Sequence, residues 1–150
     1  MAEYVENGLQ TIALNNPVLL DSSIPCTKGC IFHEDGTGIF ILKGITSNCF
    51  ARYSVTFNAN IAIPTGGAVT PIAVAIAVNG EPRATSQAIY TPAAVEEFGN
   101  ITSTCIVTVP KGCCFTLSVR YIDATAGDAA TTPTPSIEIQ NSNLVINRIA

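Results

Sequence analysis

Two alternating runs on either side of one short turn constrain the fold of this chain most strongly. Between residues 104 and 109, and again between residues 115 and 121, every odd-numbered side chain is apolar. Alternation of this kind indicates strands with one buried face. Pro110 and Gly112 in the connecting segment favour a turn, because proline presets one backbone angle and glycine accepts a left-handed one. The centre of the chain is therefore predicted to be β-structure.

The turn at Pro110–Gly112 permits two arrangements of its flanking strands. In a hairpin, the three-residue loop sets Val107 opposite Phe115 in one sheet. If the chain instead crosses between two stacked sheets, both odd-numbered faces point into one shared core. The alternation alone does not choose between these arrangements.

The rest of the chain repeats the same strand-and-turn pattern. The longest run, residues 50–63, could extend about 40 Å, so a bend or bulge midway is expected. Asn79-Gly80 predicts a tight hairpin turn. Further strands are expected at residues 9–14, 39–42, 72–78, 83–90 and 136–149. Eight to ten antiparallel strands without a convincing helix predict an all-β, single-domain sandwich or jelly roll.

Composition favours an oligomer and argues against several classes of partner. Charged residues make up 12% of the chain, against about 25% in average proteins. This deficit favours an oligomer that hides part of its surface over the alternative, a compact β protein that uses Thr, Ser and Asn for its polar faces. A net charge of -4 with seven Lys and Arg residues argues against nucleic acid binding. No apolar run is long enough to insert into a membrane. Residues 1–7 do not have the pattern of a signal peptide, so we expect folding in a cytoplasm and six cysteines as thiols.

The sequence offers weak candidates for a metal site. Cys26, Cys30 and His33 carry suitable ligand atoms, but their spacing is not that of a zinc knuckle, so we interpret them as thiols beside a loop histidine. The vicinal pair Cys113 and Cys114 is expected to point one thiol into the core and one outward, because neighbours on a strand face opposite ways. The loop carboxylates of Asp35, Asp123 and Asp128 are too sparse for a calcium cage and are expected to be solvated.

The residues also argue against an enzyme. His33 is the one histidine, so any nucleophilic triad must use it as the base. No serine lies in a G-x-S-x-G elbow. We therefore predict a protein without catalytic activity and without a cofactor.

Four segments together resemble a known family. F-A-R-Y-S-V-T-F at residues 50–57 and V-A-I-A-V-N-G-E-P at 74–82 are followed by I-V-T-V-P-K-G-C-C-F-T-L-S-V-R-Y at 106–121 and N-L-V-I-N-R-I at 143–149. Their order and character resemble C1q/TNF-like jelly rolls, above all the bacterial and phage branch with the C-terminal domains of collagen-like spore-surface proteins.

The resemblance covers residues 38–150 and bears on the organisation of the chain. It implies that Pro110–Gly112 crosses between sheets. Residues 1–37 have no Gly-X-Y repeat and are not a stalk, so we expect them to form a docking segment that covers the jelly roll or binds something else.

The resemblance further implies a trimer formed through an inner sheet that contains the first and last strands. Residues 39–42 and 144–149 fit this implication, since both are apolar on both faces. The residues expected in the trimer interface are Ile39, Phe40, Ile41, Leu42, Leu144, Val145, Ile146 and Ile149.

The function implied by the resemblance is structural. We expect a capsid decoration, head-fibre or tail-tip attachment domain on a phage virion, assembled in the bacterial host cytoplasm and bound to other virion proteins. The alternative is a carbohydrate- or receptor-binding module on a spore or cell surface, with a host-surface glycan as its ligand. Sugar sites favour exposed aromatic rings, and Tyr4 and Tyr90 are the tyrosines outside the core-facing patterns.

Overall fold

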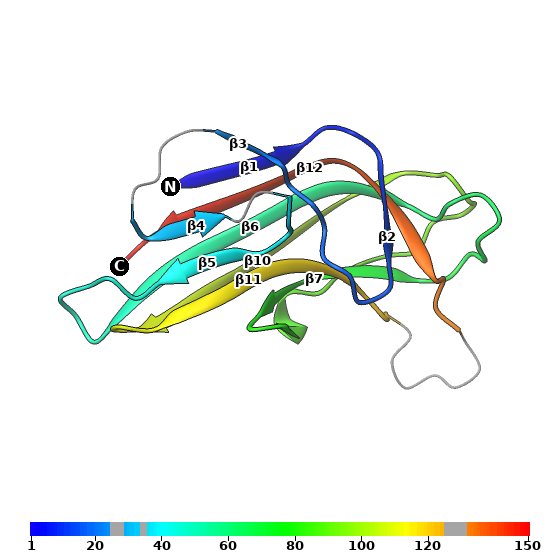
Figure 1. Ribbon diagram of the computed structural model, residues 1–150. Helices are drawn as coiled ribbons and strands as arrows, with labels where there is room; N and C mark the ends of the chain where they lie inside the picture. Colours follow the sequence, from blue (N-terminus) through cyan, green and yellow to red (C-terminus); the bar gives the residue numbers. More distant parts are fainter. Residues whose placement is uncertain (25–28, 34–35, 125–131) are drawn as a thin grey trace.

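The computed structural model describes residues 1–24, 29–33, 36–124 and 132–150. These residues form two antiparallel sheets that pack face to face, and their one helical element is the single 3-10 turn η1 (Ala84–Ser86) (Figure 1). The predicted all-β sandwich is confirmed. No helix in the described part of the chain has the length and apolar character needed to cross a membrane.

The first sheet has the strand order β10-β6-β12-β1-β3, and β2 also pairs with β12. Its strands are β1 (Ala2–Glu6), β2 (Gln10–Ala13), β3 (Ser22–Ile24), β6 (Phe50–Ala62), β10 (Gly99–Pro110) and β12 (Ser136–Arg148). The second sheet has the order β4-β5-β11-β7-β8, and β9 also pairs with β7. Its strands are β4 (Ile31–His33), β5 (Phe40–Lys43), β7 (Ile72–Val78), β8 (Glu81–Pro82), β9 (Ala88–Tyr90) and β11 (Cys114–Ile122).

The turn between β10 and β11 crosses from one sheet to the other. β10 pairs with β6 along its whole length, whereas β11 pairs with β5 and β7. Of the two arrangements that the sequence allowed, the crossing is confirmed. It directs Val107 and Val109 from one sheet, and Leu117 and Tyr121 from the other, into one core where all four are fully buried.

The sequence predicts a bend or bulge in the middle of the long strand β6, but the irregularity lies in the neighbouring strand β12. β6 pairs with β10 without interruption from Phe50 to Ile61. Its pairing with β12 shifts between Gln140 and Asn143, and Asn141 there has a left-handed φ of 53°. The extra residues bend β12, so that its first part pairs with β2 and its second part with β1.

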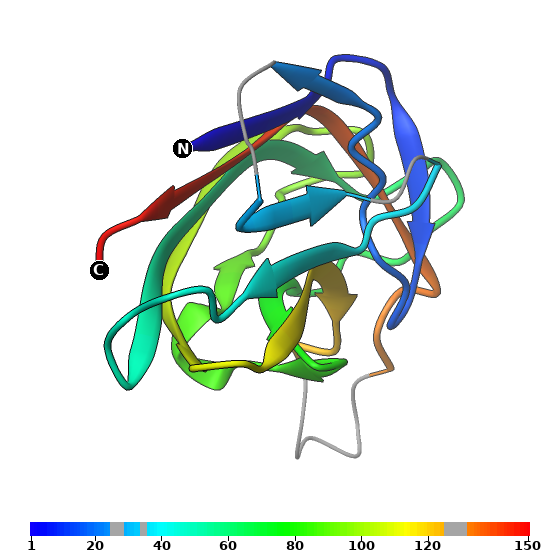
Figure 2. The same ribbon diagram turned by 60° about the vertical axis from the view of Figure 1, so that its left-hand side comes forward.

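The N-terminal segment contributes strands to both sheets. β1 lies between β12 and β3 in the first sheet, whereas β4 belongs to the second (Figure 2). After β2, the amide of Val18 donates to the carbonyl of Val119 at 2.7 Å, which joins the chain to β11. Val18 and Leu20 are fully buried, so the described part of residues 1–37 supplies core side chains as well as strands.

The predicted hairpin after β7 is confirmed, but its return strand is shorter than expected. Asn79 and Gly80 have φ of 53° and 82°, as a two-residue turn of this kind requires. The expected strand over residues 83–90 is interrupted by η1 and reduced to β9. The cause is Ser86, whose hydroxyl oxygen accepts the backbone amide of Ile76 at 2.9 Å in place of a strand partner.

Candidate functional site

The structure separates the candidate metal ligands into different surroundings. Cys26 lies outside the described residues. The Sγ atom of Cys30 lies 3.0 Å from Nη1 of Arg148. His33 is the last residue of β4 rather than a loop residue, which corrects the expectation. Its ring stacks on Phe40 with centroids 4.6 Å apart, and its Nε2 lies 2.9 Å from the carbonyl oxygen of Thr37. The described residues contain no group of three His, Cys, Asp or Glu side chains able to hold a metal ion.

The vicinal cysteines differ from the expectation that one would enter the core. Cys113 and Cys114 are both exposed. Cys113 belongs to the crossing turn, where its amide donates to Pro110 at 3.0 Å, so strand alternation does not yet apply to it. Cys49 on the facing loop is exposed too, while Cys105 is half-buried and burial raises the pKa of its thiol. All cysteines in the described part of the chain are free thiols.

The two tyrosines singled out for sugar stacking are not exposed platforms. Tyr4 is 4% exposed and packs against Phe40 with ring centroids 4.6 Å apart. Tyr90 is half-buried and lies against Gly99, where an added Cβ would come within 2.4 Å of the tyrosine ring. Of the three loop carboxylates considered for calcium, Asp123 is partly buried, and Asp35 and Asp128 lie outside the described residues.

The residues expected at a trimer interface divide between the two sheets. β5 pairs with β4 and β11 in the second sheet, and β12 belongs to the first, so the implied placement of both in one inner sheet is corrected. Phe40, Leu42, Leu144 and Ile146 are fully buried in the chain's own core and offer no surface to a partner. Ile39, Ile41 and Val145 are partly exposed, and Ile149 is 49% exposed.

The outer surface of β6, β10 and β12 forms a continuous uncharged face, which we call the first-sheet face. Strand pairing builds it from three cross-strand rows. The rows are Ile106-Ser54-Asn147, Thr104-Thr56-Val145 and Thr102-Asn58-Asn143. Charged residues stand at its margins, with Arg52 in the next row and Glu3 paired with Val145.

Many polar side chains of the first-sheet face already form hydrogen bonds with one another. Nδ2 of Asn58 donates to the hydroxyl of Thr102 at 2.7 Å, and Nδ2 of Asn100 donates to Oδ1 of Asn60 at 3.1 Å. Ile106 is 57% exposed on the edge strand β10, in the row next to Arg52. Sequence reasoning missed Ile106 because the alternating pattern was used to find core residues on the odd-numbered face, and Ile106 lies on the opposite, mostly polar face.

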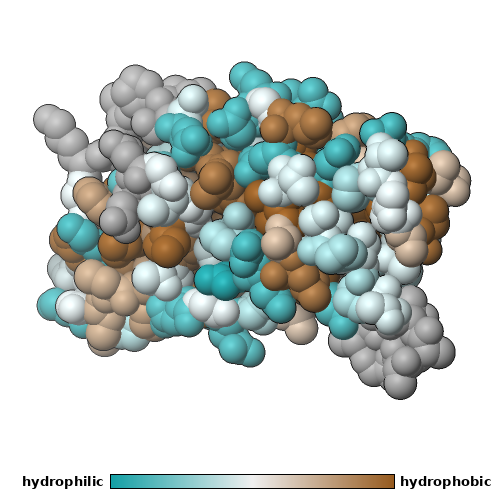
Figure 3. Space-filling model, turned by 45° about the vertical axis from the view of Figure 1, so that its right-hand side comes forward, coloured by the Kyte–Doolittle hydropathy of each residue, from teal (hydrophilic) through white to brown (hydrophobic). Residues whose placement is uncertain are grey.

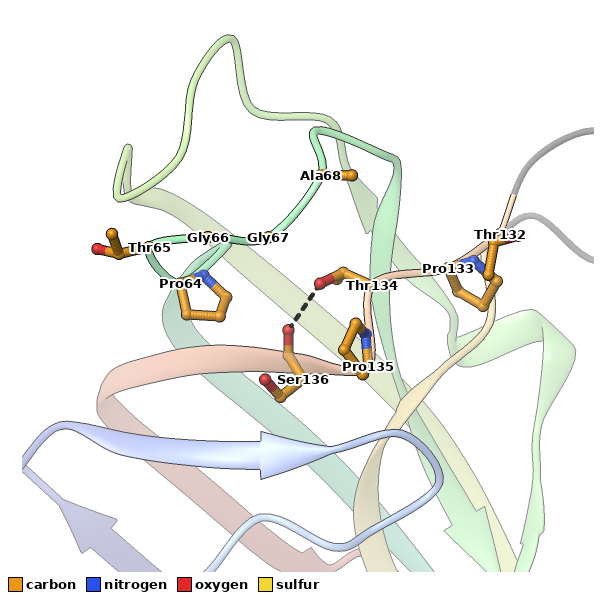
Figure 4. Close-up of a pocket in the computed structure, with 10 residues that line it drawn as sticks. All are labelled: Pro64, Thr65, Gly66, Gly67, Ala68, Thr132, Pro133, Thr134, Pro135 and Ser136. Carbon is orange, nitrogen blue, oxygen red and sulfur yellow. Dashed lines mark hydrogen bonds between the residues drawn. The ribbon is translucent and has the colours of Figure 1, made fainter.

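A pocket of about 380 Å³ lies at the end of the sandwich where β6 and β12 meet their loops (Figure 4). Its walls are residues 64–68 after β6 and residues 132–136 leading into β12. None of the lining side chains in the described part of the chain is ionisable. Sequence reasoning did not find this pocket, because two separate Pro- and Thr-rich loops carry no motif that indicates their contact.

Both walls of the pocket are fixed by hydrogen bonds. On one side, the amide of Glu96 donates to Ile63 at 2.7 Å, and the hydroxyl of Thr65 donates to Oε1 of Glu96 at 2.5 Å. On the other, the buried hydroxyl of Tyr121 donates to the carbonyl of Thr134 at 2.6 Å. The loops around this end also expose Val69, Val95 and Phe98. Apolar groups accordingly reach the surface at the right-hand end of the molecule in Figure 3.

Two antiparallel sheets with these connections define a single-domain jelly-roll sandwich of the C1q/TNF type. The globular domain of zebrafish complement 1qA protein superposes with a TM-score of 0.57 at 12% identity, covering 99% of this chain and 97% of that one. An Eiger TNF from S. frugiperda gives a TM-score of 0.62 at 10% identity, covering 100% and 92%. At these identities the similarity establishes the fold.

A third solved structure is more distant. The EclA C-terminal domain, described as a sugar-binding protein, covers 95% of this chain and 79% of its own at 15% identity, with a TM-score of 0.43 that is too low to support an argument. No family model matches the sequence, and no curated protein matches it.

Proposed function

We propose that this protein is a non-enzymatic structural protein of a phage virion surface, assembled as a homotrimer. In this role it is a capsid decoration, a head-fibre domain or a tail-tip attachment domain, and its partners are other virion proteins. The observation that carries the proposal is the uncharged first-sheet face, which is suited to burial against further copies of the chain.

The energetics of the first-sheet face support association. Burying a large apolar side chain such as Ile106 or Val145 stabilises a complex by roughly 1.5–3 kcal/mol. The asparagine and threonine groups beside them already bond to one another, so covering them leaves few polar atoms unpaired. The three rows carry no charged side chain, and the Glu3 carboxylate at their margin already accepts a hydrogen bond from Nδ2 of Asn143. A closed ring of three subunits repeats each of these contributions in every subunit.

Light scattering with matched variants tests the assembly. The purified protein is expected to have three times the chain mass of 15.7 kDa. Ile106→Asp places a charge on the first-sheet face and is expected to give monomers. Ile89→Asp is the control, because Ile89 is 58% exposed and Ile106 57%, but Ile89 lies in the second sheet. A monomeric wild-type chain, or equal behaviour of both variants, contradicts the proposal.

The virion assignment requires its own experiment. An antibody raised against the purified protein is expected to label intact phage particles by immunogold electron microscopy. Labelling confined to bacterial cells or spores would instead support the alternative location.

The second candidate function is a carbohydrate- or receptor-binding module on a spore or cell surface. The observation that favours it is the pocket at the loop end, which is open to solvent between fixed walls. A glycan array probed with the labelled protein tests it. Reproducible binding to a defined group of glycans supports this function, and uniform absence of signal contradicts it.

A further inference from the structure

We infer that the pocket between residues 64–68 and 132–136 binds one neutral sugar unit at the exposed end of a surface glycan. The inference rests on the proposed function in one respect, since attachment to a surface is what would bring such a ligand to the pocket. The volume of about 380 Å³ lies near the lower end of the range for ligand sites, roughly 300–1,000 Å³. It therefore suits a small ring rather than an extended chain.

The absence of charge among the described lining residues favours a neutral ligand. The walls consist of proline, glycine, alanine, threonine and serine. The nearby carboxylate of Glu96 accepts the hydroxyl proton of Thr65. An anionic or cationic sugar would lose hydration on entry and find no opposite charge on residues 64–68 or 132–136.

Within the neutral ligands, the lining favours one with both apolar faces and hydroxyl groups. The rings of Pro64, Pro133 and Pro135 supply apolar surface. Thr132 and Ser136 carry hydroxyls that make no hydrogen bond within the described part of the chain, so both remain available to a ligand. A sugar ring matches this combination through its C–H faces and its hydroxyls. An aromatic side chain from a partner protein would cover the prolines but leave the wall hydroxyls unpaired.

The pocket is also formed before any ligand arrives. Gly67 marks the point where the walls meet, because a Cβ there would lie 2.6 Å from Cγ2 of Ile63 and 3.2 Å from Oγ1 of Thr134. Within the second wall, the hydroxyl of Thr134 donates to the carbonyl of Ser136 at 3.3 Å, the bond drawn as a dashed line in Figure 4. Walls held in this way need little ordering on binding, which favours affinity for a small ligand.

Saturation-transfer NMR on the intact protein tests the inference. The probes are the methyl glycosides of glucose, galactose, mannose and N-acetylglucosamine, with sialic acid as the anionic comparator and N-acetyltyrosinamide as the aromatic one. Saturable transfer is expected to at least one neutral glycoside. Ser136→Ala removes one unpaired hydroxyl and is expected to weaken that binding about two- to tenfold.

A matched pair of variants locates the binding. Ala68→Phe fills the pocket from its exposed rim and is expected to abolish transfer, whereas Ala94→Phe changes an exposed alanine outside the lining and leaves it intact. No saturable transfer from any neutral glycoside overturns the inference. Binding that survives Ala68→Phe, or that prefers sialic acid or the tyrosine amide, overturns it as well. Light scattering on the same samples keeps this outcome separate from a failure of the trimer.

Discussion

At the scale of single residues, the exposed and buried thiols of this chain should differ in reactivity. The thiolate is the reactive form of cysteine, and burial raises the pKa of Cys105. Cys49, Cys113 and Cys114 are exposed at one end of the molecule. Under native conditions at pH 8 we expect iodoacetamide to modify these three first and Cys105 last, as followed by peptide mass spectrometry. Equal modification rates for Cys105 and Cys113 would contradict the half-buried position of Cys105 in β10.

The buried phenol of Tyr121 should make the fold sensitive to alkaline pH. Burial, and next the Asp123 carboxylate, raise the pKa of Tyr121 to about 12, above the value of about 10 in an unfolded chain. The unfolded state therefore loses its phenol proton first. The stability that this group contributes is present below pH 10 and declines as the pH rises towards 12.

Urea denaturation at a series of pH values measures this effect. The free energy of unfolding is expected to fall between pH 10 and 12, with a shallower fall in Tyr121→Phe. Tyr121→Phe also removes the hydrogen bond to Thr134, so it should be less stable than wild type at pH 7 by about 0.5–1.5 kcal/mol. Parallel pH profiles for the two proteins would show that Tyr121 does not cause the decline.

At the scale of elements, Ser86 should be essential to the edge of the second sheet. Its hydroxyl accepts the amide of Ile76 at 2.9 Å and donates to the carbonyl of Arg83 at 2.7 Å, and the residue is 3% exposed. Ser86→Ala leaves a buried amide without its partner, which costs about 1–3 kcal/mol. Urea denaturation should show this loss, and Ser47→Ala, at an exposed loop position, should be neutral. A neutral Ser86→Ala would mean that water replaces the hydroxyl.

Strands with a regular alternation of apolar and polar residues could be predicted from the sequence, whereas elements that depend on a contact with a distant residue could not. β6 and β10 follow from alternation, because their inward residues such as Phe57 and Val107 are fully buried. The interruption between β8 and β9 depends on the hydrogen bond from the amide of Ile76 to Ser86, and no local sequence pattern predicts that bond. Cys113 was misplaced for a related reason, since the crossing turn extends one residue further than its Pro-Lys-Gly signature.

At the scale of the whole molecule, the strand pattern predicted the sandwich and the family resemblance implied the crossing between sheets, but neither gave the neighbours of every strand. Phe40 and Leu42 alternate with partly exposed residues in the same way whether their strand belongs to the first or the second sheet. Pairing with β11 decides the matter. The pocket depended in the same way on long-range contacts, because Gly67 lies against the side-chain hydroxyl of Thr134, and no recognisable motif links these two loops.

The proposed trimer makes thermal stability depend on protein concentration. When unfolding is coupled to dissociation, mass action raises the melting temperature as the protein becomes more concentrated. Val145 lies on the first-sheet face of β12, and Val145→Asp would bury a charge in a dry interface. We expect the wild-type melting temperature to rise over a hundredfold increase in concentration, and that of Val145→Asp to stay constant at a lower value. Calorimetry at matched concentrations measures both. A wild-type melting temperature that does not change with concentration would show that the first-sheet face remains in solvent, because any trimer formed through this face couples unfolding to dissociation.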